Sequence, residues 1–254
     1  MDKADLMTKA AKLRRQLGCS ESQPVDIFLI AQNIPGLTVV LYPMGSNLSG
    51  MCVKINEELS LIAVNSEMSY GRQRFSMAHE FYHLFYDKSD KAICRRDFSH
   101  PENSTLEKEA DFFATQFLMP QTELETKVDE LAAKHPYGKL TIENVIEIEQ
   151  CFMISHKATM LRLKGRPQIS RNRFEEYYNE PGIRTIAMSM GFRPDLYLPT
   201  PEKHRYCSYG SYIRMASEIH RTSRISDGKY EELLLSAFRP DLVYGEEEEL
   251  NAID

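Results

Sequence analysis

The first third of the chain changes from a helical to a strand-like spacing of apolar residues. Apolar positions recur every three or four residues in residues 5–17, which predicts an amphipathic helix, and residues 25–31 predict a second helix. Three short apolar segments with β-branched residues follow: LTVVLY from Leu37, GMCVKI from Gly50 and SLIAV from Ser60. A polar turn at residues 56–58 separates the last two, so we expect a small sheet that contains a hairpin.

The next apolar pattern predicts a helix over residues 72–87, RQRFSMAHEFYHLFYD. Aromatic residues lie on several of its sides, which indicates that the helix is largely buried. His79 and His83 are four residues apart and therefore lie on the same face. The strand before this helix ends at Asn65 and is a candidate edge strand that could hold an extended peptide. An ordinary core strand is the alternative interpretation.

The segment after this helix begins with a predicted polar loop at residues 87–103 and continues with a predicted helix at residues 104–120. Ser104 followed by Glu107 has the spacing of a capping box, which predicts the start of the helix. Pro120 predicts its end.

The second half of the chain is mainly helical in pattern. Residues 140–163 contain two helical patterns with a break at residues 153–155, which is typical of a helix-turn-helix element, and residues 209–238 predict two helices with a break near Asp227. We therefore predict an α+β, mainly helical fold in which a small β-sheet packs on a helical core. The sequence suggests three parts: a core at 1–135, a helix-turn-helix-like element at 136–167 and a mostly helical C-terminal region at 168–254.

Composition and charge narrow the function classes. The chain has 31 basic and 37 acidic residues, and its net charge of -6 gives no general reason to expect nucleic-acid binding. No apolar run approaches the roughly 18 residues of a membrane span, and the charged first residues lack the apolar core of a signal peptide. The five cysteines are widely spaced without a CxxC pair, which argues against disulfides and a cysteine zinc site. We expect a cytoplasmic protein.

Candidate chemistry lies in the helix that carries the two histidines. His79, Glu80 and His83 form the sequence H-E-x-x-H, which on a helix is the pattern of zinc peptidases. Two imidazoles one turn apart can bind one metal ion together. Glu80 lies one position round, where it can accept a proton from water at the open position of the metal. The pattern predicts a zinc site with Glu80 as the catalytic general base.

Glu107 is the candidate third ligand, in the helix that follows. Asp111 lies four residues further on, so one helix face would supply both a ligand and an acid that orients a ligand histidine. Ala110 and Ala114 on the same side are small and would let the two helices approach closely. Glu107 could alternatively act only as a helix cap. Glu109 is a competing ligand, although it points about 200° away from Glu107 on the helix.

These segments resemble the ImmA/IrrE family of metallopeptidases, whose pattern joins R-x-F-x-x-A-H-E-x-x-H to E-x-x-A-[ND]-x-F-A-x-x-L-[LM]-P. Here the first motif is RQRFSMAHEFYH, with Arg74 or Arg72 in the arginine position, and the second runs from Glu107 to Pro120. The resemblance covers about residues 5–165. One departure is Tyr82, where the family commonly has glycine.

The resemblance implies a zinc-dependent endopeptidase that cleaves a specific protein partner. In this family the partner is typically an Xre-type helix-turn-helix repressor, and its cleavage switches on a stress, phage or mobile-element programme. We therefore expect a repressor or antitoxin encoded nearby as the substrate. The family also carries an element similar to residues 140–163 after its peptidase core.

Two other function classes remain open from the sequence. The chain could be a toxin–antitoxin-type or regulatory binding module whose metal site is not catalytic. It could instead bind DNA through residues 140–163, although the second helix offers only four basic side chains: His156, Lys157, Arg162 and Lys164. We favour packing of this element against the core over direct DNA binding.

The donor that stabilises the oxyanion in the transition state is open as well. Candidates near the motif are Tyr82, Tyr86, His100 and several arginines. The remaining histidines lack the short spacing of metal ligands, so we expect surface or hydrogen-bonding roles for them: His100, His135, His156, His204 and His220.

Overall fold

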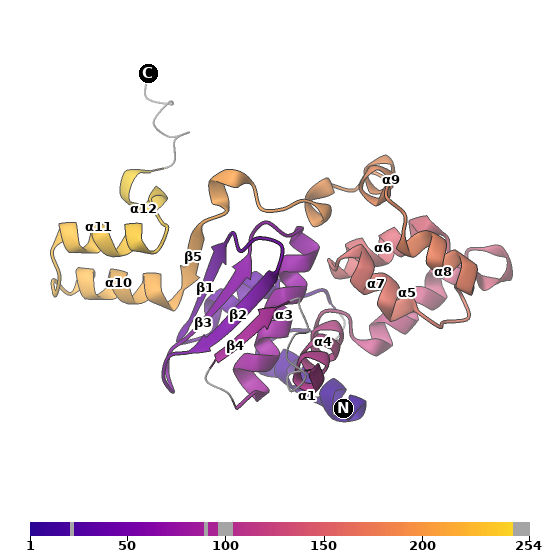
Figure 1. Cartoon of the computed structure of the whole chain (residues 1–254), viewed down its shortest axis with the longest axis horizontal. Helices are drawn as coiled ribbons and strands as arrows, with labels where there is room; N and C mark the ends of the chain where they lie inside the picture. The colour runs from indigo at the N-terminus through magenta and orange to yellow at the C-terminus, as the bar shows by residue number, and fades with distance from the viewer. Residues whose placement is uncertain (21–22, 89–90, 96–103, 246–254) are drawn as a thin grey trace, which may run out of the picture.

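The computed structural model describes residues 1–20, 23–88, 91–95 and 104–245 (Figure 1), of which residues 91–95 and 104 are described by their backbone alone. The structure is an α+β fold, mainly helical, with one small sheet, as the sequence predicts. In Figure 1 one group of helices lies to the right of the sheet and a helical pair lies to its left. Among the described helices, none combines the length and apolar character needed to cross a bilayer.

Five strands form the sheet in the order β4-β2-β3-β1-β5. Their bounds are Leu37–Tyr42 for β1, Leu48–Lys54 for β2, Ser60–Asn65 for β3, Lys91–Arg95 for β4 and Cys207–Gly210 for β5. β1 and β3 run parallel, whereas the other neighbours run antiparallel. The predicted hairpin of β2 and β3 is confirmed, and its turn is closed by Asn56, whose side chain accepts hydrogen bonds from two backbone N–H groups.

Of the two interpretations of the strand that ends at Asn65, the core strand is confirmed, and the loop prediction that follows it is wrong in part. β3 is a central strand and not an edge strand, because β1 and β2 pair with its two sides. The edges are β4 and β5. The loop predicted for residues 87–103 contains β4, which pairs with β2. Its residues 89–90 and 96–103 lie outside the part of the chain that the structure describes.

Helices α3, Tyr70–Tyr86, and α4, Ser104–Leu118, form the centre of the core. α3 packs on β2 and β3, and α4 packs along α3 (Figure 1). Aromatic rings join the two helices: Phe81 meets Phe117 edge to face with ring centroids 5.7 Å apart, and Tyr82 contacts Phe113. The predicted small alanines of α4 are completely buried. The side chain of Ser104, and with it the predicted capping box, lies outside the described side chains.

The N-terminal helices cover this core. Helix α1, Lys3–Gln16, packs on α4 through an apolar stripe that includes Leu6, Ala10 and Leu13. Helix α2, Ile27–Asn33, lies between α3 and β1 in its contacts. Both helices begin with an aspartate whose carboxylate accepts hydrogen bonds from backbone N–H groups of the first turn.

The predicted helix-turn-helix-like pair is present as α6, Ile142–Phe152, and α7, His156–Leu163. Met153 ends α6 in the left-handed conformation, with φ of 54°. The turn docks on α3, because Arg74 Nε donates a hydrogen bond to the Met153 carbonyl at 2.7 Å. A Cβ at Gly71 of α3 would lie 2.9 Å from the Ser155 nitrogen, so the contact requires glycine. The element therefore packs against the helix that carries the two histidines.

The described chain contains six further α-helices: α5 (Gln121–Ala132), α8 (Arg171–Tyr178), α9 (Ile183–Ser189), α10 (Ser211–Arg221), α11 (Asp227–Ser236) and α12 (Asp241–Tyr244). The break predicted near Asp227 is confirmed and lies between Arg221 and Asp227. Ser226 caps α11 by accepting a hydrogen bond from Lys229 N, so Asp227 opens the helix. β5 comes directly before α10 and joins the C-terminal region to the sheet.

Candidate metal centre

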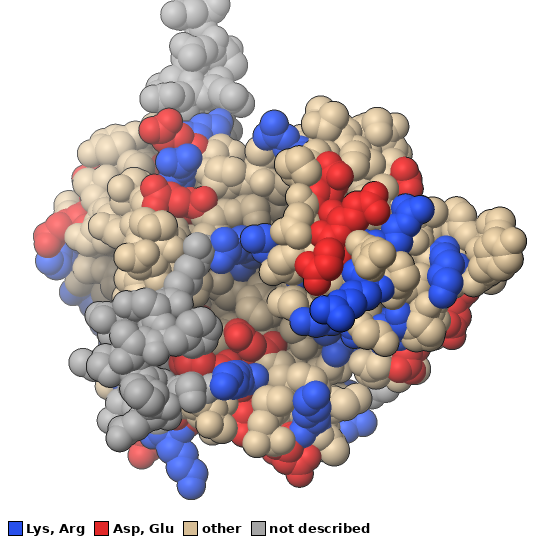
Figure 2. All heavy atoms as spheres, turned by 45° about the vertical axis from the view of Figure 1, so that its right-hand side comes forward, with Lys and Arg blue, Asp and Glu red and all other residues tan. Residues whose placement is uncertain are grey.

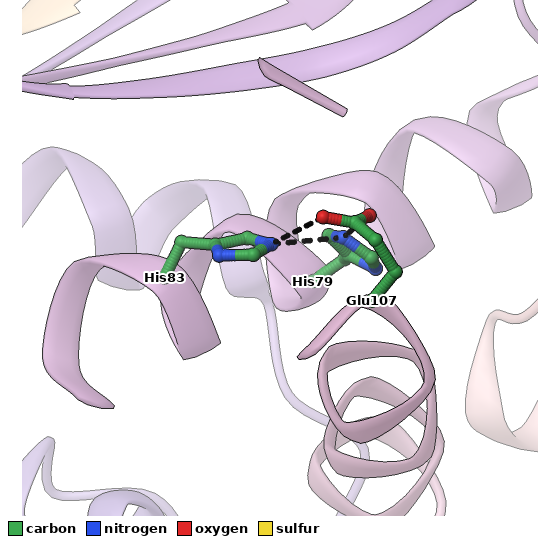
Figure 3. A group of neighbouring side chains, drawn as sticks. All are labelled: His79, His83 and Glu107. Carbon is green, nitrogen blue, oxygen red and sulfur yellow. Dashed lines mark hydrogen bonds and ion pairs between the residues drawn. The ribbon is translucent and has the colours of Figure 1, made fainter. Parts of the chain in front are cut away.

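Three side chains from two helices converge at the contact between α3 and α4 (Figure 3). His79 Nε2 and His83 Nε2 lie 3.2 Å apart. The carboxylate of Glu107 reaches both rings, with Oε2 3.2 Å from His79 Nε2 and Oε1 3.5 Å from His83 Nε2. Both histidines are buried, and Glu107 is partly exposed. The predicted ligands are therefore brought together by the fold.

This donor set fits a metal ion. One donor atom from each of the three residues lies within 4.8 Å of the other two, so an ion between them could contact all three. Structural surveys place zinc about 2.0–2.2 Å from imidazole nitrogens and carboxylate oxygens, and two histidines with one glutamate is a known set in catalytic zinc sites. Three protein ligands leave the fourth position of a tetrahedral ion open for water or substrate.

Each histidine is oriented by an aspartate at Nδ1, the ring nitrogen that does not face the metal position. His79 Nδ1 lies 2.9 Å from Asp111 Oδ1, and His83 Nδ1 lies 3.0 Å from Asp87 Oδ2. When each Nδ1–H donates to its carboxylate, the tautomer that remains presents the Nε2 lone pair to the metal position. The sequence analysis predicts this contact for Asp111. It does not predict the contact of Asp87, although Asp87 follows His83 by four residues, the same interval that links the two histidines.

The competing carboxylate, Glu109, points elsewhere. Its Oε2 accepts a hydrogen bond from the Tyr82 hydroxyl at 2.8 Å, and its Oε1 lies 3.9 Å from the N-terminal amine. The structure thus places Glu107 at the two histidines and Glu109 on another side of α4. Tyr82, the departure from the family pattern, is the residue that holds Glu109.

Glu80 is fully buried and lies beside β2, within 3 Å of the position that a Cβ of Gly50 would occupy. Its charge also acts on the neighbouring histidine. Burial alone would lower the pKa of His79, but the hydrogen bonds to Asp111 and Glu107 and the charge of Glu80 outweigh burial and raise that pKa to about 10. Burial and the charge of His79 lower the pKa of His83, against the effect of Asp87. The acids around the histidines thus favour a positive charge at this site.

Two candidate oxyanion donors are engaged elsewhere. The Tyr82 hydroxyl donates to Glu109, and the Tyr86 hydroxyl donates to the Lys9 carbonyl at 3.0 Å. His100 lies outside the described residues.

About half of the chain matches a known protein family. A family model, Peptidase_M78, described as the IrrE N-terminal-like domain, matches residues 36–164, just over half of the 254 residues. The matched segment runs from the start of β1 to the end of α7 and contains the two histidines, Glu80 and Glu107. No curated protein matches the sequence.

Proposed function

We propose that this chain, which belongs to the Peptidase_M78 family of IrrE N-terminal-like domains, is a zinc-dependent endopeptidase. The family supports a metallopeptidase-type function. The observation that carries the finer proposal is the convergence of His79, His83 and Glu107 on one point. Glu80, the neighbour of His79 in α3, is fully buried, and its charge helps to raise the pKa of His79. Two imidazoles and one carboxylate favour zinc over magnesium or calcium, which prefer oxygen ligands.

The residues have separate roles in this proposal. His79, His83 and Glu107 hold the metal, while Asp111 and Asp87 keep the two imidazoles in the tautomer that binds it. Bound zinc would act as a Lewis acid and lower the pKa of water. Glu80 accepts the proton of the attacking water and passes it to the leaving amine.

We propose as the substrate a specific protein in the cytoplasm, an Xre-type helix-turn-helix repressor or antitoxin encoded near this chain. Cleavage would relieve repression. This part of the proposal rests on the family pattern of the two motifs and not on a feature of the site. A binding module whose metal site is not catalytic is the alternative.

A direct test combines metal content with proteolysis. The purified chain is expected to contain one zinc ion and to cleave the neighbouring repressor. Glu80→Gln is expected to keep the zinc and lose about 10²–10⁴-fold in cleavage rate, the usual contribution of a general base. Glu109→Gln is the matched control and should cleave normally. Equal cleavage by wild type and Glu80→Gln would overturn the role of Glu80, whereas zinc-loaded wild type that binds the repressor without cutting it would favour the binding module.

DNA reading by α7 has less support from its contacts. Its three basic side chains, and Lys164 directly after it, all contact other parts of the protein. His156 hydrogen-bonds Glu149, Arg162 donates hydrogen bonds to the Met119 carbonyl and to Gln121, Lys157 lies over the Tyr178 ring, and Lys164 lies over the Phe174 ring. Figure 2 shows the face that carries the right-hand side of Figure 1, and there the described acidic and basic side chains are interspersed. These contacts support a packing role for α7.

A further inference from the structure

Strand β2 has an irregularity opposite the predicted general base. Its pairing with β4 shifts register between Leu48 and Gly50, which is the signature of a β-bulge. Bulges are over-represented next to active sites, where they change the direction of a strand or a side chain. Gly50 is buried on the side of the sheet that α3 covers, and it is followed two residues later by buried Cys52.

Gly50 leaves no room for a side chain. A Cβ at this position would lie 2.9 Å from Glu80 Oε1, 3.4 Å from Glu80 Cδ and 3.0 Å from the carbonyl oxygen of Ala63 on β3. Ordinary carbon–oxygen contacts are longer than the first distance. The Glu80 carboxyl thus occupies the place that a side chain of residue 50 would fill.

The backbone conformation does not explain the glycine. Gly50 is absent from the positive-φ glycines, which include Gly36 and Gly210 in the same part of the fold, so an L-residue could adopt its φ without strain. The requirement is one of space. Glu80 is 0% exposed, and its charge, after burial, contributes to raising the pKa of the Cys52 thiol to about 12, so Cys52 also lies near it.

We propose that Gly50 is a positioning residue for the general base. Because Gly50 has no side chain, the Glu80 carboxylate can pack directly against the backbone of β2, and this contact fixes the carboxylate relative to the metal position. This inference rests on the peptidase function proposed above. It assigns to β2 a part in catalysis, because two of the three atoms nearest to a Cβ at Gly50 belong to the Glu80 carboxyl group.

The kinetic test uses Gly50→Ala with the repressor that wild type cleaves. Displacing a catalytic group by about 1 Å can cost about 10²-fold, so we expect kcat to fall about 100-fold while KM and zinc content stay within about twofold. In the Glu80→Gln background the same substitution should cost less than about twofold, because the carboxylate it displaces no longer acts. Gly228→Ala on α11, where a Cβ meets nothing within 4 Å, is the matched control and should leave kcat unchanged.

A stability test needs no substrate and separates this inference from the proposed function. Gly50→Ala is expected to lower the unfolding midpoint of the wild-type protein. In the Glu80→Ala background, the same substitution should lower the midpoint by less than half as much. Equal losses in both backgrounds would mean that the Ala63 carbonyl, and not Glu80, requires the glycine, and would overturn the inference. Unchanged kcat in Gly50→Ala would overturn it too. Wild type that fails to cleave would instead count against the peptidase function.

Discussion

The carboxylate of Asp87 lies 3.0 Å from Nδ1 of His83, one helical turn further along the same row of side chains. Asp87 follows the last residue of α3, and its side chain is only 8% exposed. Lys54 on β2 donates a hydrogen bond to the Asp87 backbone carbonyl, which holds this end of the helix against the sheet. The helix that supplies two of the proposed ligands thus carries the acid that orients one of them.

Asp87→Ala is therefore expected to weaken zinc binding by about 10–100-fold, the usual cost of losing a hydrogen-bond partner of a ligand histidine. Competition with a chromophoric chelator measures the affinity. Asp5→Ala removes an exposed aspartate paired with Lys9 and serves as the control. The same affinity in both variants would show that Asp87 does not act on the metal position.

The choice between two glutamates on α4 can be tested by zinc retention. Glu107→Ala removes the carboxylate that lies near both imidazoles, so we expect the purified variant to lose its zinc. Glu109→Ala breaks the contacts with Tyr82 and the N-terminal amine, neither of which is a proposed ligand, and should retain zinc. Zinc lost in Glu109→Ala and kept in Glu107→Ala would contradict the proposed ligand set.

A buried ion pair outside the metal centre predicts how stability depends on pH. His156 Nδ1 lies 2.5 Å from Glu149 Oε1, and His156 Nε2 lies 2.7 Å from the Tyr177 carbonyl. Burial lowers the pKa of His156, but the hydrogen bond and charge of Glu149 outweigh it, so that pKa is raised; burial raises the pKa of Glu149. The folded state therefore holds these protons more tightly than the unfolded state does.

The stabilisation from His156 is fully present below its ordinary pKa of about 6.5 and is lost as pH rises through the raised value. We expect the free energy of unfolding to fall as the pH rises above about 6. Urea unfolding at several pH values measures this change. The double variant His156→Gln/Glu149→Gln should have a flatter profile over the same range. A free energy of unfolding that rises with pH in the wild-type protein would contradict the prediction.

The docking of the α6–α7 turn on α3 gives a stability prediction at Gly71. Ala at this position would push into the Ser155 backbone and Leu196, whose Cδ1 lies 3.0 Å from the new Cβ. Overpacking of this kind costs about 1–3 kcal/mol. Gly228→Ala has free space and should not destabilise the chain. Equal unfolding midpoints for the two variants would mean that the α6–α7 turn can shift to accommodate the added methyl group at little cost.

The sequence predicted the elements with strong local patterns and missed those that depend on distant partners. The helix with His79 and His83, the hairpin of β2 and β3, and the break before His156 were predicted from spacing alone. β4 and β5 were not predicted, because their sequences, KAICR and CSYG, are short. They acquire strand structure only by pairing, β4 with β2 and β5 with β1. The central place of β3 depends on the same long-range pairing and could not be inferred from its own residues.

The candidate site was predictable where helix geometry decides direction. The angle between Glu107 and Glu109 on one helix separates them correctly in the structure, and the four-residue interval places Asp111 by His79. Asp87 shares that interval with His83, but whether the helix continues far enough to use it depends on its C-terminal cap. The contact of Gly50 with Glu80 joins a strand to a helix, so no local spacing indicates it.

The pairing of β1 with β5 has a consequence for how the protein folds during synthesis. Thr38 on β1 pairs with Gly210 on β5, so one side of β1 has its partner only after most of the chain has been translated. At about 5–20 residues per second, that delay is on the order of ten seconds or more. During this interval β1 presents an unpaired row of backbone N–H and C=O groups, which is a template for intermolecular pairing. A nascent or truncated chain that stops after α7 is therefore expected to depend on chaperones and to aggregate when expressed without β5.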